Sequence, residues 1–159
     1  MKKAFTLIEV IIVTVLLATM AVIGTISISN YQRDTALGTT AASLVSQLRY
    51  AQGRAISGEG TTTWGIHFDT TEQFYAIYQG LNWGAATDIV KTYLMHGVLL
   101  YNPTLNGAGT DVLFSRLTGI TSQYGTGAGS AAICITNTSA PTTCKKTITI
   151  TANGKISWQ

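Results

Sequence analysis

The hydrophobic pattern of the chain begins with one long apolar run. Residues 5–28 read FTLIEVIIVTVLLATMAVIGTISI, in which Glu9 is the sole charged residue and the remaining interruptions are Thr, Ser and Gly. As a helix this run would be roughly 36 Å long, and the apolar core of a bilayer is about 30 Å thick. The pattern therefore predicts a helix over residues 5–28 that is long enough to span a membrane.

Residues 29–57 keep the helical period but become amphipathic. Their apolar residues recur at steps of three and four, which places them on one narrow stripe of a helix. No proline precedes Pro103, and the segment SGEGTTT then supplies two glycines. We therefore expect one helix from Phe5 to about Ser57, whose second half needs a partner to cover its stripe. The stripe consists of Leu37, Ala41, Leu44, Leu48, Ala51 and Ala55.

After residue 60 the period changes to two, which is typical of strands. The segment WGIHF alternates Trp64, Ile66 and Phe68, and QFYAIYQ follows a turn-like DTTE as the second strand of a hairpin. The C-terminal KTITITANGKISW predicts another hairpin around a type I′ turn at Asn153-Gly154. Further strands are expected in DIVKTYLM, GVLLYN, DVLFSRL and SAAICIT. The fold class is α+β, with the amphipathic half of the helix packed on an antiparallel β-sheet formed by residues 58–159.

Glu9 is out of place in the apolar run, because an unpaired carboxylate at membrane depth costs at least a few kcal/mol. One interpretation is a secretory signal peptide, with Lys2 and Lys3 as its basic region and the small residues of ATMA as its cleavage site. A second is an ordinary membrane anchor that carries a stray acid. Neither interpretation gives the carboxylate a role.

A third interpretation gives it one, because FTLIEV resembles the processing site of type IV prepilins, the family of pilins and of the pseudopilins of type II secretion. The resemblance implies that a prepilin peptidase removes the leader, residues 1–4, by cutting between Ala4 and Phe5. It also implies methylation of the new amine at Phe5 and retention of Glu9, the fifth mature residue, for assembly. The family usually has Gly before the cut, and this chain has Ala4.

Physical chemistry agrees with that role for Glu9. Cleavage would leave a positive amine at Phe5, about one helical turn from the carboxylate, and both charges need partners in an apolar setting. They can neutralise each other within one chain or between neighbouring helices. Pairing between helices penalises every packing register in which the carboxylate meets no amine.

The order of elements along the whole chain is also similar to that of type IV pilin-like proteins. LRYAQGRAISGEGTTTWGIHF and QFYAIYQ most resemble the H-type minor pseudopilins and related minor pilins, and TITITANGKISW resembles the closing hairpin of that group. The resemblance implies a filament subunit of a pilus or of a secretion pseudopilus, with homologous subunits as its partners. Before assembly the subunit would cross the cytoplasmic (inner) membrane once, with its sheet outside the cytoplasm. Many pilins have a proline that bends the apolar helix; here the nearest helix breaker is Gly24.

Net charge says little about a nucleic-acid partner. The formal charge of +3 falls to about +1 when Lys2 and Lys3 leave with the leader. The alternative function that we consider is a DNA-binding minor pilin of a DNA-uptake (competence) system, which would use Lys145, Lys146 and Lys155 around the last hairpin. Three lysines without arginine make a small electrostatic footprint, so we expect a solvated strand edge and no nucleic-acid partner.

The two cysteines favour an exported domain. Cys134 and Cys144 are ten positions apart, and a disulfide that closes such a loop contributes about 2–4 kcal/mol and persists outside the cytoplasm. The alternatives are two free thiols or a zinc pair. Neither His67 nor His96 lies at ligand spacing from a cysteine, so we expect no metal and no cofactor.

Catalytic motifs do not stand out from the background. The acids at 69, 72, 88 and 111 lie in expected turns, and the serines at 57, 115 and 130 have no base at useful spacing. The segment GTGAGS does not follow a strand or open a helix, so it is not a phosphate-binding loop. Asn137 begins an NTS sequon, which is a weak signal for glycosylation. We expect a structural protein and not an enzyme.

Overall fold

The computed structural model describes residues 6–95, 97–105, 109–121, 131–136 and 144–159, without the side chains of 22–30, 102–105, 131 and 132. The leader, the cleavage residues Ala4 and Phe5, and the side chain of His96 lie outside this description, as do Ser130 and the sequon at Asn137. The chain divides into two compact units, one up to Thr35 and one from Ala36 to Gln159, and each is described by itself.

The expected long helix is present as α1, Leu7–Ile56, and its backbone is helical through Gly24. At its C-terminus the N–H of Glu59 donates to the carbonyl of Arg54, and the N–H of Gly58 donates to the carbonyl of Ala55. Gly58 has a φ of +71°. These two bonds and the left-handed glycine form a Schellman motif, which satisfies the last carbonyls and ends the helix.

Within the described residues the strands form two antiparallel sheets of four strands each, in the orders β3-β2-β1-β5 and β4-β6-β7-β8. This confirms the α+β class. The sequence indicated antiparallel pairing of the strands but not their division into two sheets. The first sheet contains β1 (Trp64–Asp69), β2 (Phe74–Gln79), β3 (Thr87–Tyr93) and β5 (Asp111–Phe114). The second contains β4 (Leu99–Leu105), β6 (Ala131–Thr136), β7 (Lys146–Ile150) and β8 (Ile156–Trp158). A short 3₁₀ helix, η1 (Trp83–Ala85), lies between β2 and β3.

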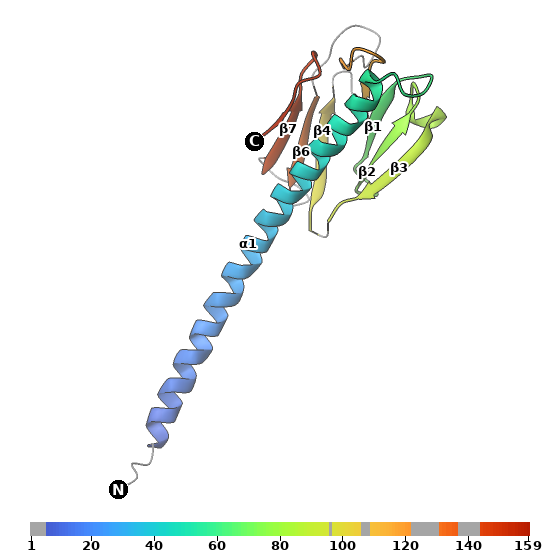
Figure 1. The fold of residues 1–159 in the computed structure, drawn as a ribbon. Coiled ribbons are helices and arrows are strands. Elements are labelled where there is room, and N and C mark those ends of the chain that lie inside the picture. Colours follow the sequence, from blue (N-terminus) through green and yellow to red (C-terminus); the bar gives the residue numbers. More distant parts are fainter. Residues whose placement is uncertain (1–5, 96, 106–108, 122–130, 137–143) are drawn as a thin grey trace. The chain divides into compact units, whose positions relative to one another are not determined.

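One hydrophobic core joins the second half of α1 to both sheets. Figure 1 shows this half of the helix lying across the sheets. All six residues of the predicted stripe, from Leu37 to Ala55, are buried. They pack with the inward-facing residues of both sheets, which include Trp64, Phe68, Phe114 and Ile148. The helical period and the strand period thus predict the two faces that meet in this core.

The last turn differs from the predicted type I′ turn. That turn requires a positive φ at both Asn153 and Gly154, whereas Gly154 has a φ of +77° and Asn153 is not among the positive-φ residues. The N–H of Gly154 donates to the carbonyl of Thr151, and the N–H of Thr151 donates to the carbonyl of Lys155. The connection is therefore a three-residue loop with a glycine bulge, the other common hairpin solution for an Asn-Gly pair.

Candidate functional site

The candidate assembly site is the apolar surface of α1 within the first unit. Every described side chain from residue 6 to residue 21 is exposed. The large apolar ones occupy nearly consecutive positions, so they cover all sides of the helix and not one stripe. They are Leu7, Ile8, Val10, Ile11, Ile12, Val13, Val15, Leu16, Leu17 and Met20.

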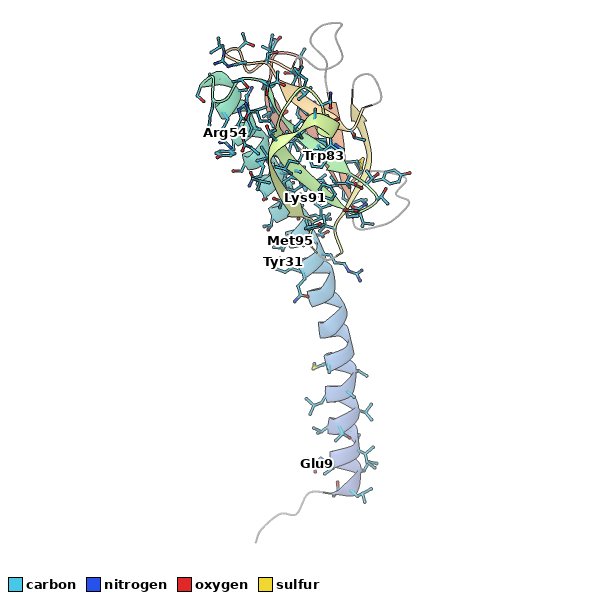
Figure 2. The ribbon with its side chains drawn as sticks, turned by 90° about the vertical axis from the view of Figure 1, so that its right-hand side faces the viewer. Glu9, Tyr31, Arg54, Trp83, Lys91 and Met95 are labelled. Carbon is cyan, nitrogen blue, oxygen red and sulfur yellow. A yellow bond between two sulfur atoms is a disulfide. The ribbon has the colours of Figure 1, made fainter. Side chains whose placement is uncertain are left out.

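Two threonine hydroxyls within this surface are satisfied inside the helix itself. Thr14 Oγ1 donates to the carbonyl of Ile11, and Thr19 Oγ1 donates to the carbonyl of Leu16, each at 2.9 Å. A hydroxyl bonded in this way can enter an apolar environment without losing its partner. Glu9 differs, because its carboxylate is exposed and takes part in no ion pair that the described residues form (Figure 2).

Glu9 also lies in the first turn of α1, a position that the apolar pattern alone does not indicate. The carbonyl of Thr6 accepts the N–H groups of Glu9 and Val10 at 3.1 and 3.3 Å, so the helix starts here. An acid at this place interacts favourably with the helix N-terminus, and the spacing Thr6-x-x-Glu9 is that of a capping box. This local role gives the carboxylate a second reason to be present, and an experiment must separate it from a role in assembly.

Among the described residues, no helix carries an apolar stretch long enough to cross a membrane. The predicted span over residues 5–28 extends beyond the side chains that the structure describes. Ala4 and Phe5, the predicted cleavage and methylation residues, also lie outside it.

The two cysteines form the expected disulfide. Cys134 in β6 is bonded to Cys144, with the Cα atoms 5.4 Å apart, and no free cysteine remains. The alternatives of two free thiols and of a zinc pair are therefore wrong for this structure. Because β6 pairs directly with β7, the bridge ties the chain entering β7 to the strand beside it.

The three lysines of the DNA-binding alternative do not gather in one patch. Lys145 and Lys146 lie at the start of β7, whereas Lys155 follows the turn at its other end, next to Thr151. Five residues of strand separate these places by about 17 Å. Lys146 also has its Nζ 5.1 Å from the ring centroid of Trp158. This arrangement does not form the continuous basic stripe that a nucleic-acid backbone requires.

His67 belongs to an aromatic cluster on the face of the first sheet that points away from α1. Its Nδ1 lies 2.8 Å from Asp111 Oδ1, and its ring stacks on Trp83 with centroids 4.3 Å apart. Phe74 packs beside both rings. The site has an imidazole and a carboxylate, and the hydroxyl of Thr110 lies 3.4 Å from the same nitrogen that faces Asp111. We interpret the cluster as a packing feature that fixes η1 on the sheet.

Arg54 forms a second cluster that the sequence did not reveal. Its guanidinium carbon lies 3.9 Å from the ring centroid of Trp64, and its Nε donates to Glu59 Oε2 at 2.7 Å. A second nitrogen of Arg54 pairs with the other carboxylate oxygen. The hydrogen bond from Arg54 lowers the pKa of Glu59, and the same bond raises the pKa of Arg54. The cluster fastens the end of α1 to the start of β1.

Of the comparisons with known proteins, the one with solved structures bears on the fold. No family model matches the sequence, and no curated protein matches it. A solved structure is similar: the minor pseudopilin EpsH from the Type 2 Secretion System of Vibrio cholerae, with a TM-score of 0.50 and 15% sequence identity. The similarity covers 77% of this chain and 94% of that one. The fold is therefore pilin-like, as the resemblance in the sequence predicts.

Proposed function

We propose that this chain is a structural subunit of a filament, either a type IV pilus-like fibre or the pseudopilus of a secretion system. The observation that carries the proposal is the apolar surface around α1 between Leu7 and Met20, attached to a pilin-like fold. Such a surface is not stable in water and needs a cover. Lipid would cover it before assembly, and the helices of neighbouring subunits would cover it in the filament.

The energetics favour this interpretation over a free helix in water. Burying one Leu, Ile, Val or Met side chain is worth about 1.5–3 kcal/mol. Ten such residues lie between Leu7 and Met20, on all sides of the helix. A helix packed on one partner needs a single stripe, whereas a helix surrounded by lipid or by several neighbours has apolar residues all round. The all-round pattern thus supports membrane insertion followed by bundling.

Glu9 would then set the register of the bundle. If the peptidase cuts before Phe5, the new amine and Glu9 are four positions apart, a separation of about 6 Å along the axis once the helix extends to Phe5. In an apolar bundle, each unpaired charge is costly, so a neighbour that offers its amine to Glu9 is strongly preferred. The pilin-like domain, with its disulfide, would lie outside the cytoplasm, where disulfides persist.

A single charge on the apolar surface tests the proposal. In Val13→Lys the ammonium should prevent the helix from packing among its neighbours, so we expect loss of the protein from filaments when the assembly machinery is coexpressed. The control is Tyr31→Lys, on the same helix and 73% exposed but beyond the apolar run. We expect normal incorporation for the control. Equal incorporation of both variants would contradict the proposal.

A further inference from the structure

Strand β3 lies at one edge of the first sheet, and among the described strands only β2 pairs with it (Figure 1). Its outer edge therefore presents backbone N–H and C=O groups that no described strand satisfies. Edges of this kind are templates for a further strand, and most proteins protect them with charges, bulges or a covering element.

The register shows which backbone groups face outward. Phe74 lies opposite Tyr93, and the N–H of Leu94 donates to the carbonyl of Gln73 at 3.1 Å. In an antiparallel pair, hydrogen-bonded positions alternate with non-bonded ones. Val90 and Thr92 therefore direct their N–H and C=O groups toward β2, like Leu94. The backbone groups of Lys91 and Tyr93, and the carbonyl of Ile89, point to the open edge.

The side chains along this edge are unusually apolar for an unprotected strand. Ile89 is 45% exposed, Val90 57% and Tyr93 63%. The first and last share one face of the sheet with Lys91, and Val90 lies on the other face. One end of the strand is closed by an irregularity at Asp88, which has a φ of +49°. The regular and open part of the edge is thus Val90–Tyr93, and Ile89 lies between it and the irregularity.

Lys91 supplies the one charge in that open part. Its Nζ lies 4.5 Å from the ring centroid of Phe74, and it is in no ion pair among the described residues. Asp69 is the nearby acid whose pKa Lys91 helps to lower, but Asp69 Oδ1 already accepts the N–H groups of Thr71 and Glu72. A carboxylate on an added strand would therefore find a cation that has no close acidic partner.

A second copy of β3 offers no acid to Lys91 across this edge. A two-fold axis that pairs two copies of β3 antiparallel stands perpendicular to the sheet, so residues that face each other lie on the same face of the sheet. Their positions in the sequence therefore differ by an even number. Asp88 and Lys91 differ by three, and they never face each other across such an axis. The register centred on Lys91 would place two ammonium groups opposite each other, which is destabilising. The charge pattern favours a different chain.

We propose that the outer edge of β3 binds an extended segment of another protein, which adds to the sheet as a fifth strand. The segment carries a carboxylate opposite Lys91, with apolar side chains opposite Ile89 and Tyr93. Its backbone bonds to the three outward-facing residues, and its side chains share their face. This inference rests on the edge alone and holds whether or not the chain forms filaments.

The test uses the full chain in detergent micelles and a fluorescein-labelled peptide Val-Thr-Glu-Thr-Val, capped at both ends. The control peptide has Lys in place of Glu. Cross-strand charge pairs are worth enough to make the acidic peptide bind roughly two- to fivefold more tightly in fluorescence anisotropy. In Lys91→Glu the control peptide with Lys should bind more tightly than the acidic peptide. The matched variant Lys155→Glu makes the same charge change at another exposed site. In this variant the acidic peptide should still bind more tightly than the control peptide.

Amide hydrogen exchange locates the bound peptide. We expect new protection at the amides of Lys91 and Tyr93, because these point to the open edge, and little change at Val90 and Thr92. The proposal is overturned by absence of binding, by protection elsewhere in the chain, or by equal binding of the two peptides.

Discussion

The side-chain amide of Gln52 donates a hydrogen bond to the carbonyl oxygen of Gly154 at 2.8 Å, across 102 positions of the sequence. The same nitrogen donates to the carbonyl of Gly119 at 2.9 Å. One side chain of α1 thus holds two loops of the second unit. At Gly154 the fit is close, because an added Cβ would lie 2.5 Å from this nitrogen.

We predict that Gln52→Ala lowers the free energy of unfolding by about 1–3 kcal/mol, since two carbonyls lose a partly buried donor. Chemical denaturation of the full chain in micelles, followed by near-UV circular dichroism, measures the change. Gln47→Ala on the same helix is the control and should change stability by less than about 0.5 kcal/mol. Equal effects of the two substitutions would show that the amide of Gln52 contributes nothing specific.

The ion pair between Arg54 and Glu59 predicts a pH dependence. The pKa of Glu59 is lowered from 4.5 in the folded chain, mainly by its hydrogen bond from Arg54. A group with a lowered folded-state pKa stabilises the fold above its unfolded pKa and loses that contribution as the pH falls through the folded pKa. Wild type should therefore be more stable than Glu59→Gln at neutral pH, and the difference should shrink as the pH is lowered below 4.5.

The difference is expected to be small because both side chains reach solvent. Arg54→Lys keeps the positive charge but loses the planar group that lies over Trp64, so it should destabilise the protein at every pH. Thermal melts between pH 3 and 7 check both expectations. A constant difference between wild type and Glu59→Gln across this range would contradict the assigned origin of the pKa shift.

The disulfide between Cys134 and Cys144 should stabilise the second unit alone. Replacing both residues with Ser is expected to lower the free energy of unfolding by about 2–4 kcal/mol, because the unfolded chain regains freedom. The folded wild-type chain should not react with a thiol label until it is reduced. Membrane retention should be unchanged, since the apolar helix is a separate element. Labelling of the unreduced chain would show that the bond does not form in the cell.

The sequence predicts elements more reliably than it predicts how distant residues meet. The stripe from Leu37 to Ala55 is visible because its period matches a helix with one buried face, and burial confirms it. The division into two sheets is not visible, since alternation identifies a strand but not its neighbour. Asn153-Gly154 fits two hairpin geometries, and local preference alone selects the wrong one.

For the functional residues the sequence indicates Glu9 and the cysteine pair, because each departs from its surroundings in type or spacing. The contacts of Gln52, and the pairing of His67 with Asp111 across 44 positions, depend on the packed fold and have no local signal. The place of Glu9 at the start of the helix does have a local signal, the Thr-x-x-Glu spacing of residues 6–9.

Processing is predicted to leave methylated Phe5 as the mature N-terminus. Intact-mass and peptide mass spectrometry of protein purified from cells with a prepilin peptidase decides this. Omission of the peptidase should leave residues 1–4 attached. A mature N-terminus near Val22 would identify a signal peptide and would remove the apolar helix on which the proposed assembly depends.

The most direct test of the proposed filament function is the incorporation of Glu9→Gln. Glutamine keeps the shape of the side chain and is accepted at this position of a capping box, so the start of α1 should stay intact. It removes the negative charge that would pair with a neighbour's amine. With the assembly machinery coexpressed, we compare the membrane-bound and the filament-incorporated fractions of wild type, Glu9→Gln and Glu9→Ala. We predict that both variants are cleaved and held in the membrane but are depleted from filaments. Incorporation of both variants at the wild-type level would contradict the proposed filament function.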